Sequence, residues 1–519
     1  MAPFRLLRLS VLFGAAVAGA ATTAAAAAPP LVEDMHDGCI HMQIIHSTNT
    51  AHFSKRAVEL SLANRTDVAY YAKLNFGTPP QPQYVQLDTG SFELWINPSC
   101  AGLSTGDAAF CNAVGAFDPA ASSTFASLGT GKQLRYGIGT ANITYVLDDI
   151  ALPGTTSVLQ QVQFGVATTT SDEFSGILGI GYGEGLTTRY PNFVDALALQ
   201  NVTRVKAFTL ALGSKDEQEG VIVFGGVDTS KFAGRLARLP ITPAASSPDG
   251  VPRYWVNLTS VALTAPGSSS SSTSSKTYPN SALQVFLDSG STLTLLPTAL
   301  ADAIAADFGA AAGGNANGFY TVDCSLAGRP GSLDFAFAGA TVRVPYHELI
   351  RRSGNTCMLG IQGSADFVLL GDTFLRSAYV VIDQTDNAVW LAQYVNCGST
   401  PAALASAASL TTLTGACTAA DSLDMSSSTS STASSSSSSS GSSSSSSSSP
   451  GGGSPASPPP APSTGAGGQP SSAATPGGGN GASAANGGST SSAAVRRPTL
   501  GKTLVLAVLA GPLMLGLFV

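Results

Sequence analysis

YVQLDTGSFELWIN, residues 84–97, places an acid, a hydroxyl and a glycine directly after an alternating apolar run. VFLDSGSTLTLL, residues 285–296, repeats this pattern 200 positions later, with Val, Leu, Asp, Gly and Ser in register. An acid at the end of an apolar strand is unusual for a hydrophobic core, because a buried charge needs a partner. The repeat therefore predicts two similar halves that bring Asp88 and Asp288 together.

Length and composition indicate two lobes built from strands. The 519 residues exceed the roughly 250–300 at which a single core stops growing. Charged residues make up 11% of the chain, against roughly 25% in ordinary soluble domains, and short apolar runs broken by Gly, Pro, Asn and Asp fill residues 67–393. Helical patterns are confined to 192–200 and 297–308. The net charge of −7 argues against nucleic-acid binding, which needs a basic surface.

Two carboxylates in contact can hydrolyse a bond because they do not both ionise readily. Two unit charges at about 4 Å repel by roughly 4 kcal/mol at an effective dielectric of about 20, which separates their titrations by about three pH units. One proton is then shared at acidic pH, so one group acts as acid and the other as base toward a water. Gly90 and Gly290 are expected to donate backbone N–H groups, while Ser91 and Ser291 hold the outer carboxylate oxygens.

Each half carries a second matched element. Ile177-Leu178-Gly179 follows Asp88 at a distance similar to that of Leu369-Leu370-Gly371 from Asp288. Such tripeptides suit strands threaded through the wide loop that bears each Asp, and their recurrence supports an internal duplication.

The histidines exclude other hydrolytic chemistries. Beyond residue 56 only His347 remains, in PYHEL, and no H-E-x-x-H motif surrounds it. A Ser-His-Asp triad or a zinc site is therefore not expected, nor is a cofactor, and His347 is interpreted as a surface residue.

The motifs resemble those of pepsin-like (family A1) aspartic endopeptidases, and among these the fungal GPI-anchored, yapsin-like group. The resemblance covers about 70–393 and rests on FGTPPQ, DTGSFELW, YGIG, SGILGIGY, VIVFGGVD-SKF, LDSGST and LLGDTFLRSAYVVID. It implies an all-β, bilobal fold with two pseudo-two-fold-related β lobes, about 57–240 and 241–393, around a central cleft. The shared-proton argument is the known logic of this family and is not independent support for it.

The resemblance also implies roles for individual residues. Asp88 and Asp288 would flank a water at the cleft floor, and a hairpin flap around Tyr136 and Gly137 would close over the peptide, with Tyr136 near Trp95. A monomer that acts on protein or peptide substrates is expected. The alternative is a catalytically inactive, protease-like binding or adhesion protein. Such a protein usually lacks an Asp or the hydroxyl and glycine after it, and both sets are intact here.

The chain departs from its relatives near the cleft. Ile138 replaces a common Thr or Ser, which puts a flap hydroxyl contact with substrate in doubt, whereas Ser291 in place of Thr keeps its hydroxyl. Phe92-Glu93 is bulkier and more acidic than the usual pair and is expected to alter packing beside the cleft. The loop between Cys100 and Cys111 lacks the acidic insertion associated with basic-residue preference, so that preference is not carried over.

The cysteines indicate an oxidising compartment. With Cys39 in the N-terminal segment, six of the seven remain, an even number. Proximity in the sequence favours three disulfides, which are Cys100–Cys111, Cys324–Cys357 and, beyond the last strand, Cys397–Cys417.

The N-terminal residues read as targeting and processing signals. Residues 1–20 have the charged and apolar regions of a secretory signal peptide, and the apolar run is too short for a single-pass anchor. Residues 21–56 are interpreted as a propeptide that ends in Lys55-Arg56, a site for a kexin-like protease. This segment contains four of the five histidines: His36, His41, His46 and His52. They could loosen the propeptide on acidification, or simply be solvated.

The C-terminal residues predict attachment to a surface. Residues 418–490 form a Ser/Gly/Pro-rich, disordered stalk, and 491–519 resemble a GPI-anchor signal. The rival is a tail-anchored transmembrane helix, but the 16 apolar residues from Leu504 fall short of the roughly 20 needed and Gly511-Pro512 interrupts them. The attachment residue is either Asn486 or Ser492. The expected location is the outer face of the plasma membrane, with or without transfer to the cell wall.

Four Asn-x-Ser/Thr sequons are candidate N-glycosylation sites in a secreted chain. They begin at Asn64, Asn142, Asn201 and Asn257.

Overall fold

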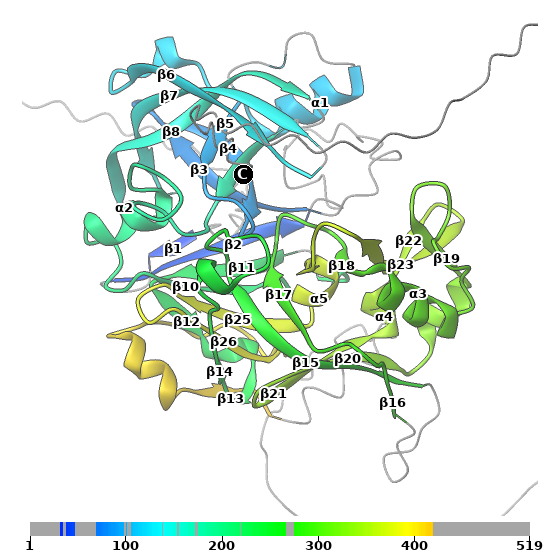
Figure 1. Ribbon diagram of the computed structural model, residues 1–519. Coiled ribbons are helices and arrows are strands. Elements are labelled where there is room, and N and C mark those ends of the chain that lie inside the picture. The colour runs from blue at the N-terminus through cyan, green and yellow to red at the C-terminus, as the bar shows by residue number, and fades with distance from the viewer. Residues whose placement is uncertain are drawn as a thin grey trace, which may run out of the picture. The chain divides into compact units, whose positions relative to one another are not determined.

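The computed structural model describes residues 32–34, 38–46, 69–97, 100, 105–137, 139–152, 155–171, 175–217, 219–265 and 275–418. Strands dominate this part of the chain and form two large sheets (Figure 1), which confirms the predicted all-β, bilobal architecture. The alternating pattern of residues 84–88 reflects a strand with one buried face, because Val85 and Leu87 are fully buried on the same side of β4 (Gln81–Asp88).

The first sheet has 14 strands and carries Asp88 at the end of β4. In spatial order the strands are β14 (Ala237–Pro240), β26 (Ala388–Gln393), β25 (Ala378–Asp383), β10 (Ala207–Ala211), β11 (Glu219–Phe224), β2 (Ile40–His46), β3 (Tyr70–Phe76), β4 (Gln81–Asp88), β9 (Gly176–Gly179), β5 (Leu94–Ile96), β8 (Val158–Ser171), β7 (Thr140–Ala151) and β6 (Ala126–Arg135), with β1 (Val32–Asp34) beside β2. Residues 378–393, near the end of the folded part, thus pair within the sheet of the first half.

The second sheet has 10 strands, and its strand β17 ends immediately before Asp288. Its strands are β19 (Phe319–Val322), β23 (Thr356–Ser364), β18 (Thr294–Pro297), β24 (Leu369–Leu370), β17 (Leu283–Leu287), β15 (Trp255–Thr264), β20 (Ser332–Phe337) and β21 (Ala340–Pro345), with β16 (Ser275–Thr277) beside β15 and β22 (Ile350–Ser353) beside β23.

Both predicted helices are present, and α2 begins as its sequence requires. The Asn192 side chain accepts a hydrogen bond from the Asp195 amide and the Asp195 carboxylate accepts one from the Asn192 amide, a reciprocal capping box. The α-helices are α1 (Thr105–Val114), α2 (Phe193–Leu199), α3 (Thr298–Asp307), α4 (Tyr346–Leu349) and α5 (Asp372–Leu375), and the 3₁₀ turns are η2 (Pro119–Ala121), η3 (Thr229–Lys231), η4 (Ala244–Ser246), η5 (Cys324–Gly328) and η6 (Ala407–Thr411). Helix α1, which begins within the Cys100–Cys111 loop, was not predicted from the sequence.

The two matched tripeptides thread the Asp-bearing loops, as predicted. Strand β9 runs parallel to β4 and antiparallel to β5, so it lies between the strands on either side of the Asp88 loop. Strand β24 has the same relation to β17 and β18 on either side of the Asp288 loop. The duplication seen in sequence is therefore a duplication of topology.

Strand β2 belongs to the N-terminal segment 21–56 and yet lies inside the first sheet. It pairs antiparallel with β11 on one side and with β3 on the other (Figure 1). His41 and His46 are 8% and 2% exposed, so the alternative that these imidazoles are solvated is wrong for both. His36 and His52 lie outside the described residues.

The three predicted disulfides are present, with Cα–Cα distances of 5.7 Å for Cys100–Cys111, 5.1 Å for Cys324–Cys357 and 5.7 Å for Cys397–Cys417. Cys39 is a buried thiol. Each predicted pairing is confirmed.

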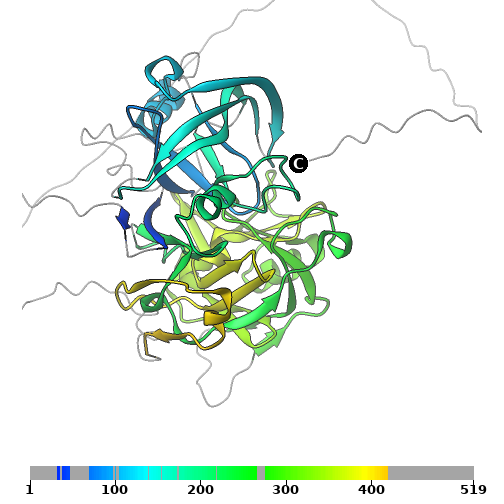
Figure 2. The ribbon, with the colours of Figure 1, turned by 90° about the vertical axis from the view of Figure 1, so that its left-hand side faces the viewer.

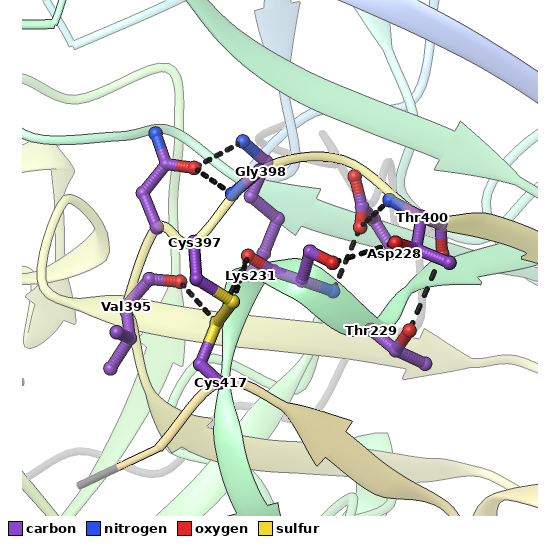
Figure 3. Close-up of a disulfide and its surroundings, with 10 residues drawn as sticks. Asp228, Thr229, Lys231, Val395, Cys397, Gly398, Thr400 and Cys417 are labelled. Atoms are coloured by element: carbon purple, nitrogen blue, oxygen red, sulfur yellow. Dashed lines mark hydrogen bonds between the residues drawn. A yellow bond between two sulfur atoms is a disulfide. The ribbon is translucent and has the colours of Figure 1, made fainter. Parts of the chain in front are cut away.

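The segment that carries the last disulfide returns to the body of the fold. Strands β27 (Pro401–Ala403) and β28 (Thr414–Ala416) pair with β12 (Gly226–Asp228) and β13 (Ala233–Arg235), and Figure 2 shows this gold segment against green strands. Figure 3 shows Cys397–Cys417 near Asp228, whose fully buried carboxylate accepts hydrogen bonds from the Ser399 hydroxyl and the Thr400 amide, each 2.8 Å long. The folded unit therefore extends past residue 393 to about residue 417.

Across the described ranges, no helix has the length and apolar character required to cross a membrane.

Candidate active site

The two Asp residues have equivalent hydrogen-bond partners. The Gly90 amide donates to Asp88 Oδ1 over 2.8 Å, and the Ser91 hydroxyl donates to Asp88 Oδ2. At the second site the Gly290 amide donates to Asp288 Oδ1 over 3.0 Å, and the Ser291 hydroxyl donates to Oδ2 over 2.7 Å. These are the contacts expected from the sequence for glycine and serine. Each carboxylate thus keeps a fixed orientation although both residues are almost fully buried, with exposed fractions of 6% and 8%.

The two loops meet so closely that each glycine faces the carboxylate of the other half. A Cβ atom at Gly90 would collide with the carboxylate of Asp288, and one at Gly290 would collide with that of Asp88. Glycine is therefore required by close approach at these two positions. The loops are brought together across 200 residues of chain, as the repeat predicts.

Thr89 and Ser289 lock the two loops in a reciprocal arrangement. Thr89 Oγ1 accepts from the Ser289 amide and donates to the Leu287 carbonyl, both over 2.9 Å. Ser289 Oγ accepts from the Thr89 amide over 3.1 Å and donates to the Leu87 carbonyl over 2.9 Å. Both side chains are buried, and each hydroxyl satisfies backbone groups that lie next to an Asp. The sequence shows both hydroxyls but does not predict that they interlock.

We expect Thr89→Val to lower the free energy of unfolding by about 1–3 kcal/mol. Valine keeps the shape of threonine but leaves the buried Ser289 amide and Leu287 carbonyl without their partner. Urea unfolding of the variant would measure this loss. Thr89→Ser, which retains the hydroxyl, is the control, and equal losses in both variants would contradict the lock.

Burial and proximity keep a proton on this pair of acids. Burial raises the pKa of Asp288 to about 7, assisted by the Asp88 charge and by a hydrogen bond with the Asp88 side chain. The bonds donated by Ser291 and Gly290 act in the opposite direction and are outweighed. A carboxyl group that stays protonated up to near-neutral pH can donate a proton while its neighbour accepts one.

A hairpin made of β6 and β7, called the flap below, carries the predicted Tyr136 and Gly137. The indole Nε1 of Trp95 donates a hydrogen bond of 2.7 Å to the Tyr136 hydroxyl, so Tyr136 lies beside Trp95 as the resemblance implies. Gly137 is exposed at the tip, where the Tyr136 amide donates to the Gly139 carbonyl over 2.8 Å. Ile138 lies outside the described residues.

Arg253 is a residue near the site that the sequence did not single out. Its guanidinium lies 5.5 Å from the ring centre of Phe92 and 5.1 Å from that of Phe286. It donates to the Gly90 carbonyl and pairs with Asp249 over 2.8 Å. The side chain therefore contacts both halves of the site, and only the unusual Phe92 could have indicated this from sequence.

Four of the remaining predicted residues lie in the described part of the chain, namely His347, Asn142, Asn201 and Asn257. His347 has a side chain that is 39% exposed and pairs with Asp216 over 2.6 Å, which confirms it as a surface residue. Asn201 and Asn257 are exposed, and Asn142 donates a hydrogen bond of 2.8 Å to Thr169. Three predicted modification sites lie outside the described residues: Asn64, Asn486 and Ser492.

Comparisons with known proteins identify the family of the chain. A family model described as eukaryotic aspartyl protease matches residues 69–394. A probable aspartic-type endopeptidase, opsB, from Aspergillus fumigatus is 34% identical over 349 residues, which cover 63% of this chain and 69% of that protein. Secreted aspartic protease 3 of Candida albicans is 36% identical over 357 residues, which cover 65% of this chain and 82% of that protein.

Among solved structures, the crystal structure of an aspartic proteinase from Irpex lacteus matches with a TM-score of 0.49 and 23% identity, and covers 63% of this chain and 94% of that one. The family model alone spans more than half of the sequence, including both Asp motifs. The chain is an aspartic-type endopeptidase and belongs to the eukaryotic aspartyl protease family, with the pepsin-like fold.

Proposed function

We propose that this chain is a secreted, cell-surface endopeptidase that hydrolyses peptide bonds at acidic pH by activating a water between Asp88 and Asp288. The observation that carries the proposal is the pair of matched carboxyl groups, each fixed by a Gly amide and a Ser hydroxyl and each facing the glycine of the other loop. The intact, equivalent sets of partners favour catalysis over an inactive binding protein.

The proposed chemistry needs one ionised and one protonated carboxyl. The ionised group removes a proton from the water, whose oxygen attacks the peptide carbonyl carbon, and the protonated group donates its proton to the carbonyl oxygen. Collapse of the tetrahedral intermediate breaks the C–N bond, with a proton delivered to the leaving nitrogen. The glycines admit the close approach of the two acids, and the flap would cover the bound peptide.

The acidic optimum follows from the shared proton. Because the pKa of Asp288 is raised to about 7, the singly protonated pair persists at acidic pH and loses its acid as the pH rises past about 7. Activity should therefore fall on the alkaline side with the titration of this pair.

The surface location rests on sequence signals at both ends. Secretion would follow from residues 1–20, release of residues 21–56 by a kexin-like protease from Lys55-Arg56, and GPI attachment at Asn486 or Ser492 from residues 491–519. The Ser/Gly/Pro-rich stalk would hold the endopeptidase away from the membrane or cell wall. These features favour the yapsin-like group, and the names of relatives include secreted aspartic proteases.

Cleavage of a peptide library by the purified chain would test the activity. We expect hydrolysis that is greatest at acidic pH, declines above about pH 7 and is blocked by pepstatin. Activity that resists pepstatin, or that persists unchanged at alkaline pH, would contradict the proposed mechanism.

Phosphatidylinositol-specific phospholipase C would test the anchor on intact cells. We expect this lipase to release the protein from the membrane fraction into the medium. Continued membrane association after treatment would instead support a transmembrane tail, while retention in the wall fraction would indicate transfer to the cell wall.

A further inference from the structure

Glu93 is a buried carboxylate five residues after Asp88, in the segment between Asp88 and β5. Its side chain is only 4% exposed. Its backbone is fixed to β9, because the Gly179 amide donates to the Glu93 carbonyl over 3.1 Å. A Cβ atom at Gly179 would collide with the backbone of this same segment, so the two run in close contact. Glu93 is therefore part of the rigid surroundings of the Asp88 loop.

Three side chains converge on the Glu93 carboxylate, and two of them belong to the flap. Lys132 of β6 forms an ion pair with Oε1 over 2.9 Å, and the hydroxyl of Tyr145 of β7 donates to the same oxygen over 3.0 Å. The third is Tyr190, which precedes α2 and donates to Oε2. One carboxylate thus joins both strands of the flap to the segment that follows Asp88.

The contact lies on the inner face of the flap. Side chains alternate along a strand, so Lys132, Leu134 and Tyr136 point to the same side. Leu134 is 2% exposed and packs with Trp95, and Tyr136 accepts the Trp95 hydrogen bond. At about 3.3 Å per residue, Lys132 lies roughly 13 Å along the strand from Tyr136. The flap is therefore held near its tip through Trp95 and further down through Glu93.

The Glu93 carboxylate and its three partners, Lys132, Tyr145 and Tyr190, are called the clamp below. A buried carboxylate is stable only when its oxygens are paired, and here a cation and two hydroxyl donors pair them. Burial raises the pKa of both Tyr145 and Tyr190 well above the ordinary value, with the Glu93 charge adding to the effect, so both remain protonated donors. Their rings also pack edge to face, with centres 5.5 Å apart.

We propose that Glu93 is a positioning residue that holds the flap over the Asp88 loop through Lys132 and Tyr145. It does not take part in proton transfer. The clamp fixes the position of the flap relative to the two Asp residues. It thereby sets how tightly an extended peptide binds between the flap and these residues. This inference rests on the proposed function, since it assigns the flap a role in binding peptide substrates.

Variants that remove one partner at a time separate positioning from plain stability. Lys132→Met and Tyr145→Phe each remove a flap-side contact to Glu93. Tyr190 belongs to neither flap strand, and Tyr190→Phe removes one hydroxyl from the same carboxylate while keeping the ring that packs against Tyr145, so it is the matched control for Tyr145→Phe. All three leave Glu93 itself in place, so the fold keeps its buried acid and at least two of its partners.

We expect Lys132→Met to raise KM for a long peptide and the inhibition constant of pepstatin about tenfold, with kcat changed less than threefold. Tyr145→Phe should show the same change with smaller size, whereas Tyr190→Phe should leave KM and pepstatin binding within twofold of the parent. The double variant Glu93→Gln/Lys132→Met should have KM and a pepstatin inhibition constant no higher than those of Lys132→Met alone. The reason is that Lys132→Met already removes the ion pair that Glu93→Gln would remove. Equal changes in KM for Tyr145→Phe and Tyr190→Phe would overturn the proposal.

Hydrogen exchange of the full-length protein provides a readout that does not depend on activity. Amides of the flap, residues 131–145, should exchange about tenfold faster in Lys132→Met than in the parent or in Tyr190→Phe. Unchanged flap exchange in Lys132→Met would overturn the clamp even if the protein is an active endopeptidase. If instead the parent cleaves no peptide but flap exchange responds as expected, the proposed function fails and the clamp stands.

Discussion

Asp88→Asn and Asp288→Asn are each expected to reduce kcat by at least about 10³-fold, within the range of about 10²–10⁴ that positioned acid–base groups contribute. An amide cannot accept a proton from water or donate one to a carbonyl oxygen as a carboxyl group does. The fold should tolerate either change, because asparagine retains one oxygen to accept from the glycine amide or the serine hydroxyl. Steady-state cleavage of one peptide at acidic pH measures the loss.

Stability against pH gives an independent check on the Asp288 variant. The pKa of Asp288 is raised from 3.8 to about 7, so the folded state favours the neutral acid. The contribution of protonated Asp288 to the free energy of unfolding is complete below about pH 3.8 and is lost as the pH rises to about 7. An asparagine amide does not ionise, so it avoids the cost of a buried charge at this position. At about pH 7 Asp288→Asn should therefore be more stable than the parent by up to about 4 kcal/mol.

The same comparison distinguishes loss of chemistry from loss of fold. At about pH 3.5 the parent and the Asp288→Asn variant should unfold at similar urea concentrations, whereas near pH 7 the variant should require more urea. A variant that is inactive and also destabilised at both pH values would mean that the carboxyl is structural. Undiminished activity in either asparagine variant would refute the assignment of the acid pair.

The repeated motif allowed the centre of the site to be predicted from sequence. Asp88, Gly90 and Ser91 recur in register, and residues that recur in two related halves must occupy equivalent places in the fold. The threaded strands β9 and β24 were predictable for the same reason. The disulfides followed from an even count and short separations, which left few pairings.

Contacts between segments far apart in sequence were not predictable in this way. Glu93 looked only like an unusual acid beside the cleft, and nothing local indicates that Lys132, Tyr145 and Tyr190 converge on it. The reciprocal bonds of Thr89 and Ser289 likewise depend on how the two halves face each other. Such contacts depend on how distant segments pack in the folded protein. No local pattern in the sequence, such as a repeat or a periodicity, indicates which residues will meet.

Strand β2 shows how a local reading can miss a buried element. Its sequence, IHMQIIH, is short and carries two histidines, so it lacks the clean alternation of a half-buried strand. A central strand covered on both faces needs no alternation, since both sets of side chains are buried. The observed burial pattern, with six of its seven residues buried, fits that explanation.

Acidification is expected to weaken the fold through His46, the last residue of β2. The ring stacks on Tyr70 at 4.8 Å between ring centres. Its pKa is lowered from 6.5 to about 4, first by burial and then by the positive charge of Arg376, with Arg351 in the same direction and Glu348 opposed. The folded state therefore favours the neutral ring, whereas the unfolded chain takes up a proton below about pH 6.5.

The sign of this linkage fixes the experiment. Stability that depends on neutral His46 is complete above about pH 6.5 and declines as the pH falls toward 4, by roughly 2–3 kcal/mol at about pH 4.5. His46→Phe keeps an aromatic ring against Tyr70 and removes the titration, so its loss of stability between about pH 7 and 4.5 should be smaller than that of the parent by this amount. Urea unfolding in an Asp88→Asn background, which prevents self-cleavage, measures both.

His347→Phe is the matched control for the substitution itself, because it replaces a 39% exposed imidazole outside β2 by the same phenyl ring. An identical acid-dependent loss in His46→Phe and the parent would contradict the assignment. The expected result would also mean that acidic pH favours release of β2 from the first sheet. If Lys55-Arg56 is cleaved as proposed, β2 stays in the fold through noncovalent contacts, which include its pairing with β11 and β3 and the packing of its side chains. Protonation of His46 weakens the side-chain packing under the acidic conditions in which the acid pair is active.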